Sequence, residues 1–315
     1  MGDLSARILL FLLDTAGPVA LGFWLRQRGL ASKAFTDLVI RVNVRVVFTI
    51  LAFISFWKLS FTADMAVIPA AGLLALLVPC LLGMALTRRN PDPLERGALV
   101  LSAMLGNTGT VGGLAAYLII GPAAFACVQL AALIQSLIVV LLCFPMCQRF
   151  RDQADAEGGP LRRRTFREVF LTWNQVSILG MIAGAALSIG GVGQPEELAS
   201  VFGALVHLST WVKLIPVGML LDIDAIRAVL KRTLIIIPVK FIAVPAFIWL
   251  FSRACLASPA LTASLVIMSA CPTAITAVFT CALYGLRTEI AMASFASTMS
   301  VFLMIVCPAL FLLFT

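Results

Sequence analysis

Two long apolar segments of the chain are interrupted at their centres by residues that suit chemistry better than membrane packing. In the first half, residues 98–120 contain the sequence GNTGTVGG, and in the second half, residues 260–284 contain SACPTA. The two interruptions fall at corresponding places when each half is counted from its first apolar helix. Paired Gly- or Pro-interrupted hydrophobic segments indicate the binding site of a secondary transporter.

The residue types at the interruptions favour the binding of a small anion. An unpartnered backbone group in hydrocarbon costs several kcal/mol, so interrupted helices are expected to face a polar cavity inside the protein. Half-helices that begin there direct N–H groups and positive dipole ends toward that cavity. Small residues also suit close helix packing, and a lone proline makes an ordinary kink, but the pairing favours function. The predicted substrate-binding residues are Asn107, Thr108, Gly109, Pro272 and Thr273.

Other polar residues within apolar segments have two interpretations each. Asp14, in LLFLLDTAGPVAL, is either a residue that couples transport to protons or cations, or a buried structural acid. Lys213 either attracts an anion or extends its ammonium toward the cytoplasmic face, and Lys240 presents the same ambiguity. His207 is a candidate for attracting an anion or exchanging a proton, against the alternative of a packing residue.

The composition excludes a soluble protein. Hydrophobic residues make up 61% of the 315 positions and charged residues only 12%. The net charge of +8 comes from basic residues in short connections, where they set membrane orientation, so no nucleic-acid partner is predicted. The eight cysteines form no CxxC pair and suit apolar packing. We predict no metal and no cofactor.

The apolar pattern predicts an all-α membrane protein with ten transmembrane helices. The predicted spans are 4–24, 38–57, 66–86, 98–120, 124–146, 170–189, 198–221, 233–251, 260–284 and 290–314. Residues 1–146 form a first five-helix repeat, 147–169 a cytoplasmic linker and 170–315 a second five-helix repeat. Because five is odd, the second repeat enters the membrane in the opposite orientation, which gives an inverted repeat.

The distribution of basic residues predicts the orientation in the membrane. Arginine and lysine gather in the connections that follow odd-numbered spans, and few lie in the others. The positive-inside rule therefore places these connections in the cytoplasm and both termini outside, in a multi-pass protein of the cell membrane. Trp24, Trp57, Trp173 and Trp249 fall at span ends, where amphipathic rings prefer the headgroup layer.

Two stretches resemble a known family. The sequence GNTGTVGGLAAYLIIGPAAFACVQLAALIQSLIVV resembles the fourth and fifth helices of the auxin efflux carrier family, which includes bacterial malate permease-like proteins and plant PIN auxin exporters. CPTAITAVFTCALYG is similar to that family's ninth helix. The chain departs from the family at Leu114 and Thr273, where prolines are common. The site residues that the resemblance implies are Asn107, Thr108, Gly109 and Pro272.

The resemblance also implies an architecture and a mechanism. It implies two broken helices that cross at the substrate site, a scaffold of helices one, two, six and seven, elevator-type alternating access and a homodimer. The expected substrate is a small organic anion such as a carboxylate or an auxin-like acid.

An intramembrane enzyme and a sodium-coupled symporter are the alternatives to an organic-anion carrier. An enzyme is not expected, because the chain has no HExxH pair, no GxSxG elbow and no pair of mid-span aspartates. The alternative within transport is a sodium-coupled organic-anion symporter of the bile-acid type. Such a symporter needs oxygen-rich cation sites, and Asn107 is the one amide in either interruption. The solute, the direction of flux and the coupling ion stay open.

Overall fold

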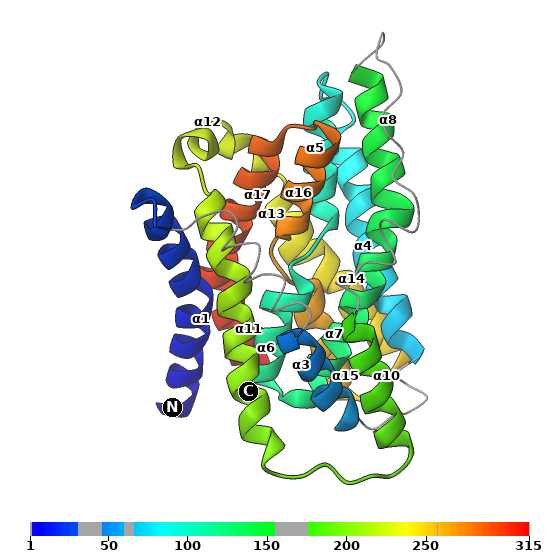
Figure 1. Cartoon of the computed structure of the whole chain (residues 1–315). Helices are drawn as coiled ribbons and strands as arrows, with labels where there is room; N and C mark the ends of the chain where they lie inside the picture. The colour runs from blue at the N-terminus through cyan, green and yellow to red at the C-terminus, as the bar shows by residue number, and fades with distance from the viewer. Residues whose placement is uncertain (1, 31–45, 60–65, 155–175, 257, 315) are drawn as a thin grey trace.

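The computed structural model describes residues 2–30, 46–59, 66–154, 176–256 and 258–314, and its regular elements are helices that run along one long direction (Figure 1). In the first half they are α1 (Gly2–Gln27), α3 (Phe48–Trp57), α4 (Val67–Thr87), α5 (Pro93–Met104), η3 (Thr108–Gly112), α6 (Gly113–Ile119), α7 (Pro122–Ile138), η4 (Val139–Cys143) and α8 (Phe144–Ala154). In the second half they are α10 (Val176–Ile189), α11 (Leu198–Leu220), α12 (Ile223–Thr233), α13 (Ile236–Pro238), η6 (Val239–Ala243), α14 (Val244–Cys255), α15 (Pro259–Ser269), α16 (Ile275–Tyr284), α17 (Thr288–Val301), η7 (Phe302–Val306) and α18 (Cys307–Phe314). The η segments are π-helical turns that continue the neighbouring α-helices, except at the start of η3.

Five helices in the described part of the chain are long and apolar enough to cross a membrane. A span needs about 20 apolar residues. The five helices cover Ser5–Gln27, Val67–Thr87, Leu198–Met219, Ile236–Cys255 and Thr288–Phe314. Shorter apolar helices include the second half of the first interrupted segment, Thr108–Ile119, and both halves of the second, Pro259–Ser269 and Ile275–Tyr284. The fold is therefore that of an all-α protein embedded in a membrane.

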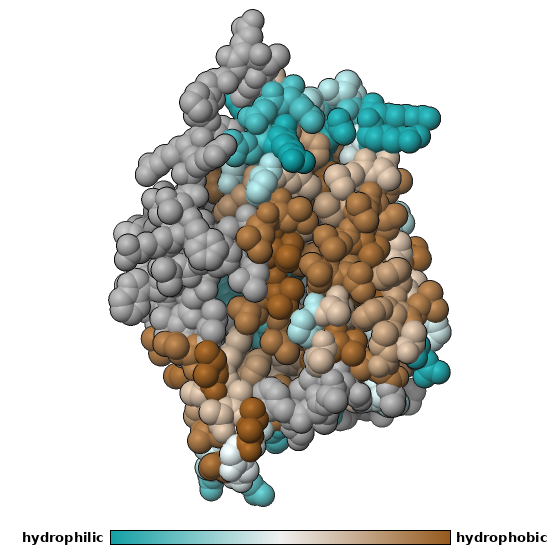
Figure 2. Space-filling view, turned by 90° about the vertical axis from the view of Figure 1, so that its right-hand side faces the viewer, coloured by the Kyte–Doolittle hydropathy of each residue, from teal (hydrophilic) through white to brown (hydrophobic). Residues whose placement is uncertain are grey.

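The surface agrees with this environment. In Figure 2, a broad apolar belt lies below a polar end of the molecule. Large apolar side chains such as Leu141, Leu179, Met304 and Leu312 are each more than half exposed. Apolar surface of this extent is normally shielded from water, and the lipid chains of a membrane would shield it.

Glycines bring two pairs of helices into very close contact. In the pair α1 and α11, a Cβ added to Gly22 would lie 1.9 Å from the Ile215 carbonyl oxygen, and one added to Gly218 would lie 2.0 Å from that of Val19. The same device joins α3 to α10, where a Cβ on Gly184 would lie 2.2 Å from the Phe53 carbonyl oxygen. Small residues of this kind let membrane helices approach backbone to backbone.

Both predicted interruptions are confirmed. In the first, α5 ends at Met104 and the helix resumes at Thr108; in the second, α15 ends at Ser269 and α16 begins at Ile275. The two half-helices that lead into the interruptions start in the same way, with a proline at the first helical position and a side-chain cap from Asp92 or Ser258.

Some segments differ from the sequence-based expectation or lie outside the described residues. Helix α12 occupies a stretch expected to be a connection: Asp222 accepts a hydrogen bond from the Ala225 N–H at 3.1 Å and so caps a new helix. Helix α8 continues to Ala154, into the expected linker. Residues 38–45 of the second predicted span, 155–169 of the linker and 170–175 of the sixth span are not among the described residues.

Candidate functional site

The two interruptions meet each other as a short antiparallel bridge. The Asn107 N–H donates to the Pro272 carbonyl oxygen at 2.7 Å, and the Ala274 N–H donates to the Leu105 carbonyl oxygen at 2.9 Å, on either side of the paired Gly106 and Thr273. We call residues 105–109 and 270–274 the crossing. Backbone groups that lose their helical partners at one interruption therefore find partners at the other, which is the condition for irregular backbone at membrane depth.

Thr273 fastens the second interruption through two further hydrogen bonds. Its hydroxyl donates to the Ser102 carbonyl oxygen at 2.9 Å, and its N–H donates to the Thr298 hydroxyl of α17 at 2.9 Å. A proline at this position has no N–H to donate. Threonine at this position thus makes a contact to α17 that a proline could not make.

Two glutamines of α7 donate to carbonyl groups of the first interruption. The Gln129 amide donates to Gly109 and the Gln135 amide to Gly106, both at 2.9 Å, and the Thr108 hydroxyl donates back to Gln135 at 3.2 Å. The Gln129 side-chain oxygen is buried and has no hydrogen-bond partner among the described residues. Sequence reasoning missed both glutamines, although amides six residues apart in an apolar helix were the available signal.

Lys240 approaches the crossing from the η6 turn. Its side chain is buried, with 4% of the residue exposed, and its ammonium donates to the Leu105 carbonyl oxygen at 3.1 Å. A cavity of about 20 Å³ lies beside it, large enough for a water molecule. Its polar lining comes from Gly106, Thr108, Gln135, Lys240 and Ser269, and the described lining contains no carboxylate.

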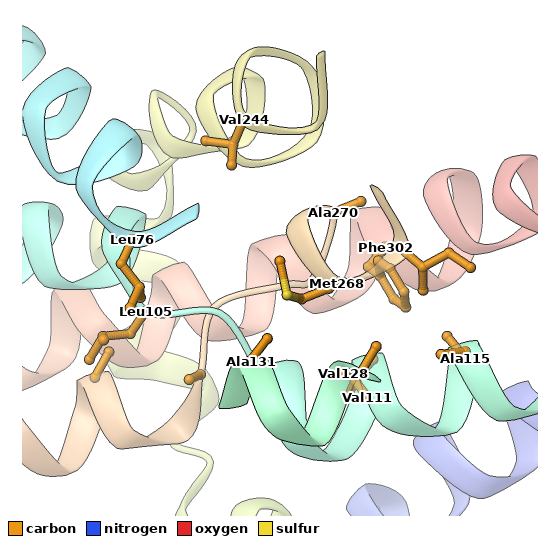
Figure 3. Close-up of a cluster of buried hydrophobic side chains, with 14 of the residues drawn as sticks. Leu76, Leu105, Val111, Ala115, Val128, Ala131, Val244, Met268, Ala270 and Phe302 are labelled. Atoms are coloured by element: carbon orange, nitrogen blue, oxygen red, sulfur yellow. The ribbon is translucent and has the colours of Figure 1, made fainter. Parts of the chain in front are cut away.

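The packing around the crossing is tight. Figure 3 shows Leu105 of the first interruption beside Leu76, and Val111 beside Val128, with Met268 of α15 in the same buried cluster. A Cβ added to Gly112 would lie 2.5 Å from the Cys271 sulfur. Glycine at this position therefore lets the two interrupted helices come together.

Asn107 has an unusual environment for a buried amide. The residue is 8% exposed, yet its side chain caps no helix and makes no hydrogen bond to a described residue. Buried polar groups are nearly always paired. The Asn107 amide is therefore available for a ligand at the crossing, although Asn107 does not line the cavity beside Lys240.

Asp14 and His207 belong to a second polar cluster, between α1 and α11. One Asp14 carboxylate oxygen contacts the His207 Nδ1, and the other accepts a hydrogen bond from the Trp211 indole at 2.7 Å. The ring of Tyr117, on α6, lies edge-on to the His207 ring with centroids 6.3 Å apart. This cluster joins two helices that are distant in sequence and touches a half-helix that begins at the crossing.

The structure thus separates the predicted site residues into two groups. Asn107, Thr108, Gly109, Pro272 and Thr273 come together at the crossing. Asp14, His207 and Lys213 lie elsewhere and do not line its cavity. The described residues contain no group of three or more His, Cys, Asp or Glu side chains placed to hold a metal ion.

The chain matches no protein-family model and no curated protein.

Proposed function

We propose that this protein is a secondary carrier that binds a small organic anion, such as a carboxylate or an auxin-like acid, at the crossing. The observation that supports this most directly is the hydrogen-bonded meeting of two interrupted apolar helices beside a buried lysine. Irregular backbone inside a membrane protein is tolerated where it lines a site, and carriers place their substrates at such paired interruptions.

The hydrogen bonds at the crossing favour an anion over a cation. The carbonyl groups of Leu105, Gly106 and Gly109 already accept hydrogen bonds from Lys240, Gln135 and Gln129. At the other end of each interruption, the N-termini of η3 and α16 receive no side-chain cap. These three carbonyl groups are paired, whereas the two helix N-termini have no side-chain cap, so the ligand proposed for the site carries negative charge.

The helix contacts support an inverted five-plus-five repeat. Such a repeat maps α1 onto α10, α3 onto α11, and α4 onto the α13–α14 helix. Each contact in one half then needs a counterpart: α1 with α11 corresponds to α10 with α3, and α4 with α5 corresponds to α14 with α15. Both pairs of contacts are present. The same repeat maps α5 onto α15 and α7 onto α17. The contact between α5 and α17 then corresponds to the contact between α15 and α7, and both are present.

The proposed arrangement in the cell follows the family resemblance and the charges. We propose a carrier of the auxin efflux type that works as a homodimer, with ten spans, both termini outside the cell membrane and the 147–169 linker in the cytoplasm. A single cysteine placed at Gly158 in a chain without its native cysteines should resist membrane-impermeant reagents in intact cells. Labelling from outside would refute this orientation.

Counterflow in proteoliposomes tests the function. Vesicles loaded with unlabelled L-malate or indole-3-acetate should accumulate the labelled compound when they contain the protein, and the uncharged amides should not exchange. Lys231→Ala, a change at an exposed residue of α12, serves as the matched control and should leave exchange unchanged. A folded protein that exchanges neither anion would refute the proposal for these substrate classes.

Replacing sodium by choline separates the carrier from the sodium-coupled alternative, because a sodium-coupled symporter would no longer exchange the labelled anion in choline.

A further inference from the structure

We propose that a groove between α1 and α17 binds one molecule of an anionic glycerophospholipid, with an acyl chain in the groove and the phosphate at Arg26 and Arg227. This inference goes beyond the proposed function and does not rest on it, because its test measures lipid binding and not transport.

The groove lies between two helices that are far apart in the sequence. Its volume of about 330 Å³ falls within the range of about 300–1,000 Å³ that is usual for ligand sites. Ala16, Ala20 and Ser300 are exposed members of its lining, so lipid can enter from the surrounding membrane. The large apolar side chains of the described lining come from α1, α12, α17 and the η7 turn that continues α17: Val19, Phe23, Ile223, Phe295, Met299 and Leu303.

The hydroxyl groups in the groove are already paired within their own helices. The Thr15 hydroxyl donates to the Phe11 carbonyl oxygen at 2.7 Å, and the Ser300 hydroxyl donates to the Ala296 carbonyl oxygen at 2.9 Å. The described lining contains no charged side chain. A polar solute would lose its hydrogen bonds to water here and find few replacements, whereas hydrocarbon has none to lose. The groove therefore suits an acyl chain better than a small organic anion.

A polar cavity of about 510 Å³ adjoins the groove, and we call it the mouth. Phe23, Leu221 and Ile223 line both cavities, so the two are neighbours. Arg26 and Arg227 belong to the lining of the mouth. In Figure 1, α12 lies at the end of the molecule that the C-terminal end of α1 reaches. An apolar groove with a basic mouth at the end of a membrane helix matches the two parts of an anionic lipid.

The arginines of the mouth keep donors for a phosphate. Arg26 donates one N–H to the Leu221 carbonyl oxygen at 2.7 Å, out of the five that a guanidinium carries. Neither arginine forms an ion pair with an acid among the described residues. The acids of the mouth lie at the N-terminal end of α12, where Asp222 caps the helix and Asp224 is in its first turn, so the helix dipole offsets their charge. Arginine binds phosphate oxygens through paired N–H groups, and two such side chains are available here.

Trp24 indicates the depth of the mouth in the membrane. The residue is 45% exposed, and the Arg28 guanidinium lies over its ring, 5.6 Å from the centroid. Exposed tryptophans at the ends of apolar helices lie in the headgroup layer, so Arg26, two residues further on, lies at the level of lipid phosphates. At 1.5 Å per residue, Thr15 lies roughly 16 Å deeper along α1. That depth matches one leaflet, which is half of the roughly 30 Å hydrocarbon core.

Thermal melting of the purified full-length protein in detergent tests the headgroup. A ligand that binds the folded state raises the melting temperature, and dioleoyl-phosphatidylglycerol should do so at a lower concentration than dioleoyl-phosphatidylcholine. In Arg26→Gln/Arg227→Gln, the phosphatidylglycerol concentration that gives half of the shift should rise at least about tenfold. The matched control is Arg88→Gln/Arg89→Gln, which removes two exposed charges that do not line the groove or the mouth and should respond as the wild type does. Equal stabilisation by the two lipids, or a wild-type response in Arg26→Gln/Arg227→Gln, would overturn the inference.

Glycerol 3-phosphate separates a lipid from a free phosphate ester, because it carries an anionic phosphate without acyl chains. We expect it to leave the melting temperature unchanged at concentrations where phosphatidylglycerol has its full effect. An equal effect of the two compounds would show a site for soluble phosphates and would overturn the assignment to a lipid.

Filling the groove tests the position of the acyl chain. Ala20→Phe/Ala296→Phe places two rings in the groove from opposite sides and should abolish the shift with phosphatidylglycerol. Ala6→Phe, at an exposed residue near the other end of α1, is the control and should keep the shift. If the double variant does not fold, Ala20→Phe alone takes its place, since Ala20 is exposed. A wild-type response in a groove-filling variant would put the lipid elsewhere on the surface and refute the proposal.

Discussion

Replacing Gly112 by alanine is the sharpest test of how closely the two interrupted helices approach. The new Cβ would lie 2.5 Å from the Cys271 sulfur, whereas comfortable contacts between non-bonded atoms are about 3.5–4.0 Å. The Cys271 side chain must therefore rotate away from its contact with the Ile267 carbonyl oxygen, or one of the two segments must move by about 1 Å or more. Overpacking of this kind costs about 1–3 kcal/mol, which corresponds to a roughly 5- to 150-fold shift in an equilibrium.

An opposing effect has to be weighed, because alanine is the better helix former. In a helix interior, alanine is favoured over glycine by about 1 kcal/mol. Gly109, in the same π-helical turn, measures this gain alone, since its added Cβ meets its nearest neighbours at 3.4 Å. We expect Gly109→Ala to keep or raise thermal stability relative to the wild type and Gly112→Ala to lower it. Gly193→Ala, where nothing lies within 4 Å of the added Cβ, is the second control.

The clash also predicts which second change restores the protein. Cys271→Ala removes the sulfur that the new methyl group meets, so Gly112→Ala/Cys271→Ala should be more stable than Gly112→Ala alone. Melting curves of the wild type, the two single variants and the double variant, measured in one detergent, give the coupling energy between positions 112 and 271. We expect it to lie between about 0.5 and 3 kcal/mol, as for residues in contact. Additive effects of the two changes, or a Gly112→Ala variant as stable as Gly109→Ala, would refute the reasoning about the crossing.

Three further predictions concern single side chains. Asn107→Ala should keep the melting temperature, because the amide has no described protein partner to lose, but reduce counterflow by removing ligand contacts worth about 1 kcal/mol or more; wild-type kinetics would remove Asn107 from the site. Asp14→Asn should abolish the response of net transport to a pH gradient and leave counterflow intact if Asp14 carries a proton, whereas a structural acid predicts an unaltered pH response. Asp92→Asn should lower the melting temperature at pH 7. Burial raises the pKa of the Asp92 carboxyl, but hydrogen bonds from Arg287 and two backbone N–H groups outweigh it, so the pKa lies below its ordinary value of 3.8. The lowered pKa stabilises the fold above that value, and the difference from wild type should disappear as the pH falls below it; a difference that persists in acid would argue against the ion pair.

The interruptions could be predicted from the sequence because their causes are local. Proline removes a helical hydrogen bond wherever it stands, and four glycines within eight residues loosen a helix without help from other segments. Long apolar helices are local features in the same sense, since each satisfies its own backbone. These two kinds of signal explain why the all-α membrane character and the places of the interruptions followed from the residues alone.

The partners at the site could not be predicted in the same way. Lys240 reaches a carbonyl group 135 positions earlier in the chain, and Trp211 reaches Asp14 across 197 positions. A lysine near a span end looks the same in sequence whether its ammonium extends to the headgroups or turns to a buried carbonyl oxygen. Helix α12 could not be predicted for a different reason: an aspartate directly after an apolar span looks in sequence like the end of one helix, while Asp222 caps the next.

The origin of the hydrogen bonds at the crossing bears on how the proposed elevator would move. Side chains that hold it come from α7, η6 and α17, whereas α1 and α11 are joined to each other through Asp14, His207 and Trp211. A body formed by the first group could therefore carry these bonds of the crossing with it when it moves past the second. Where the groups touch, the rings of Tyr117 and Phe202 meet edge to face, with their centroids 5.4 Å apart. Such a ring contact is weak, so a sliding movement would break it at little cost in free energy. Arg7 of α1 donates to the Leu118 carbonyl oxygen of α6 at 3.3 Å, so this bond must open in any such movement.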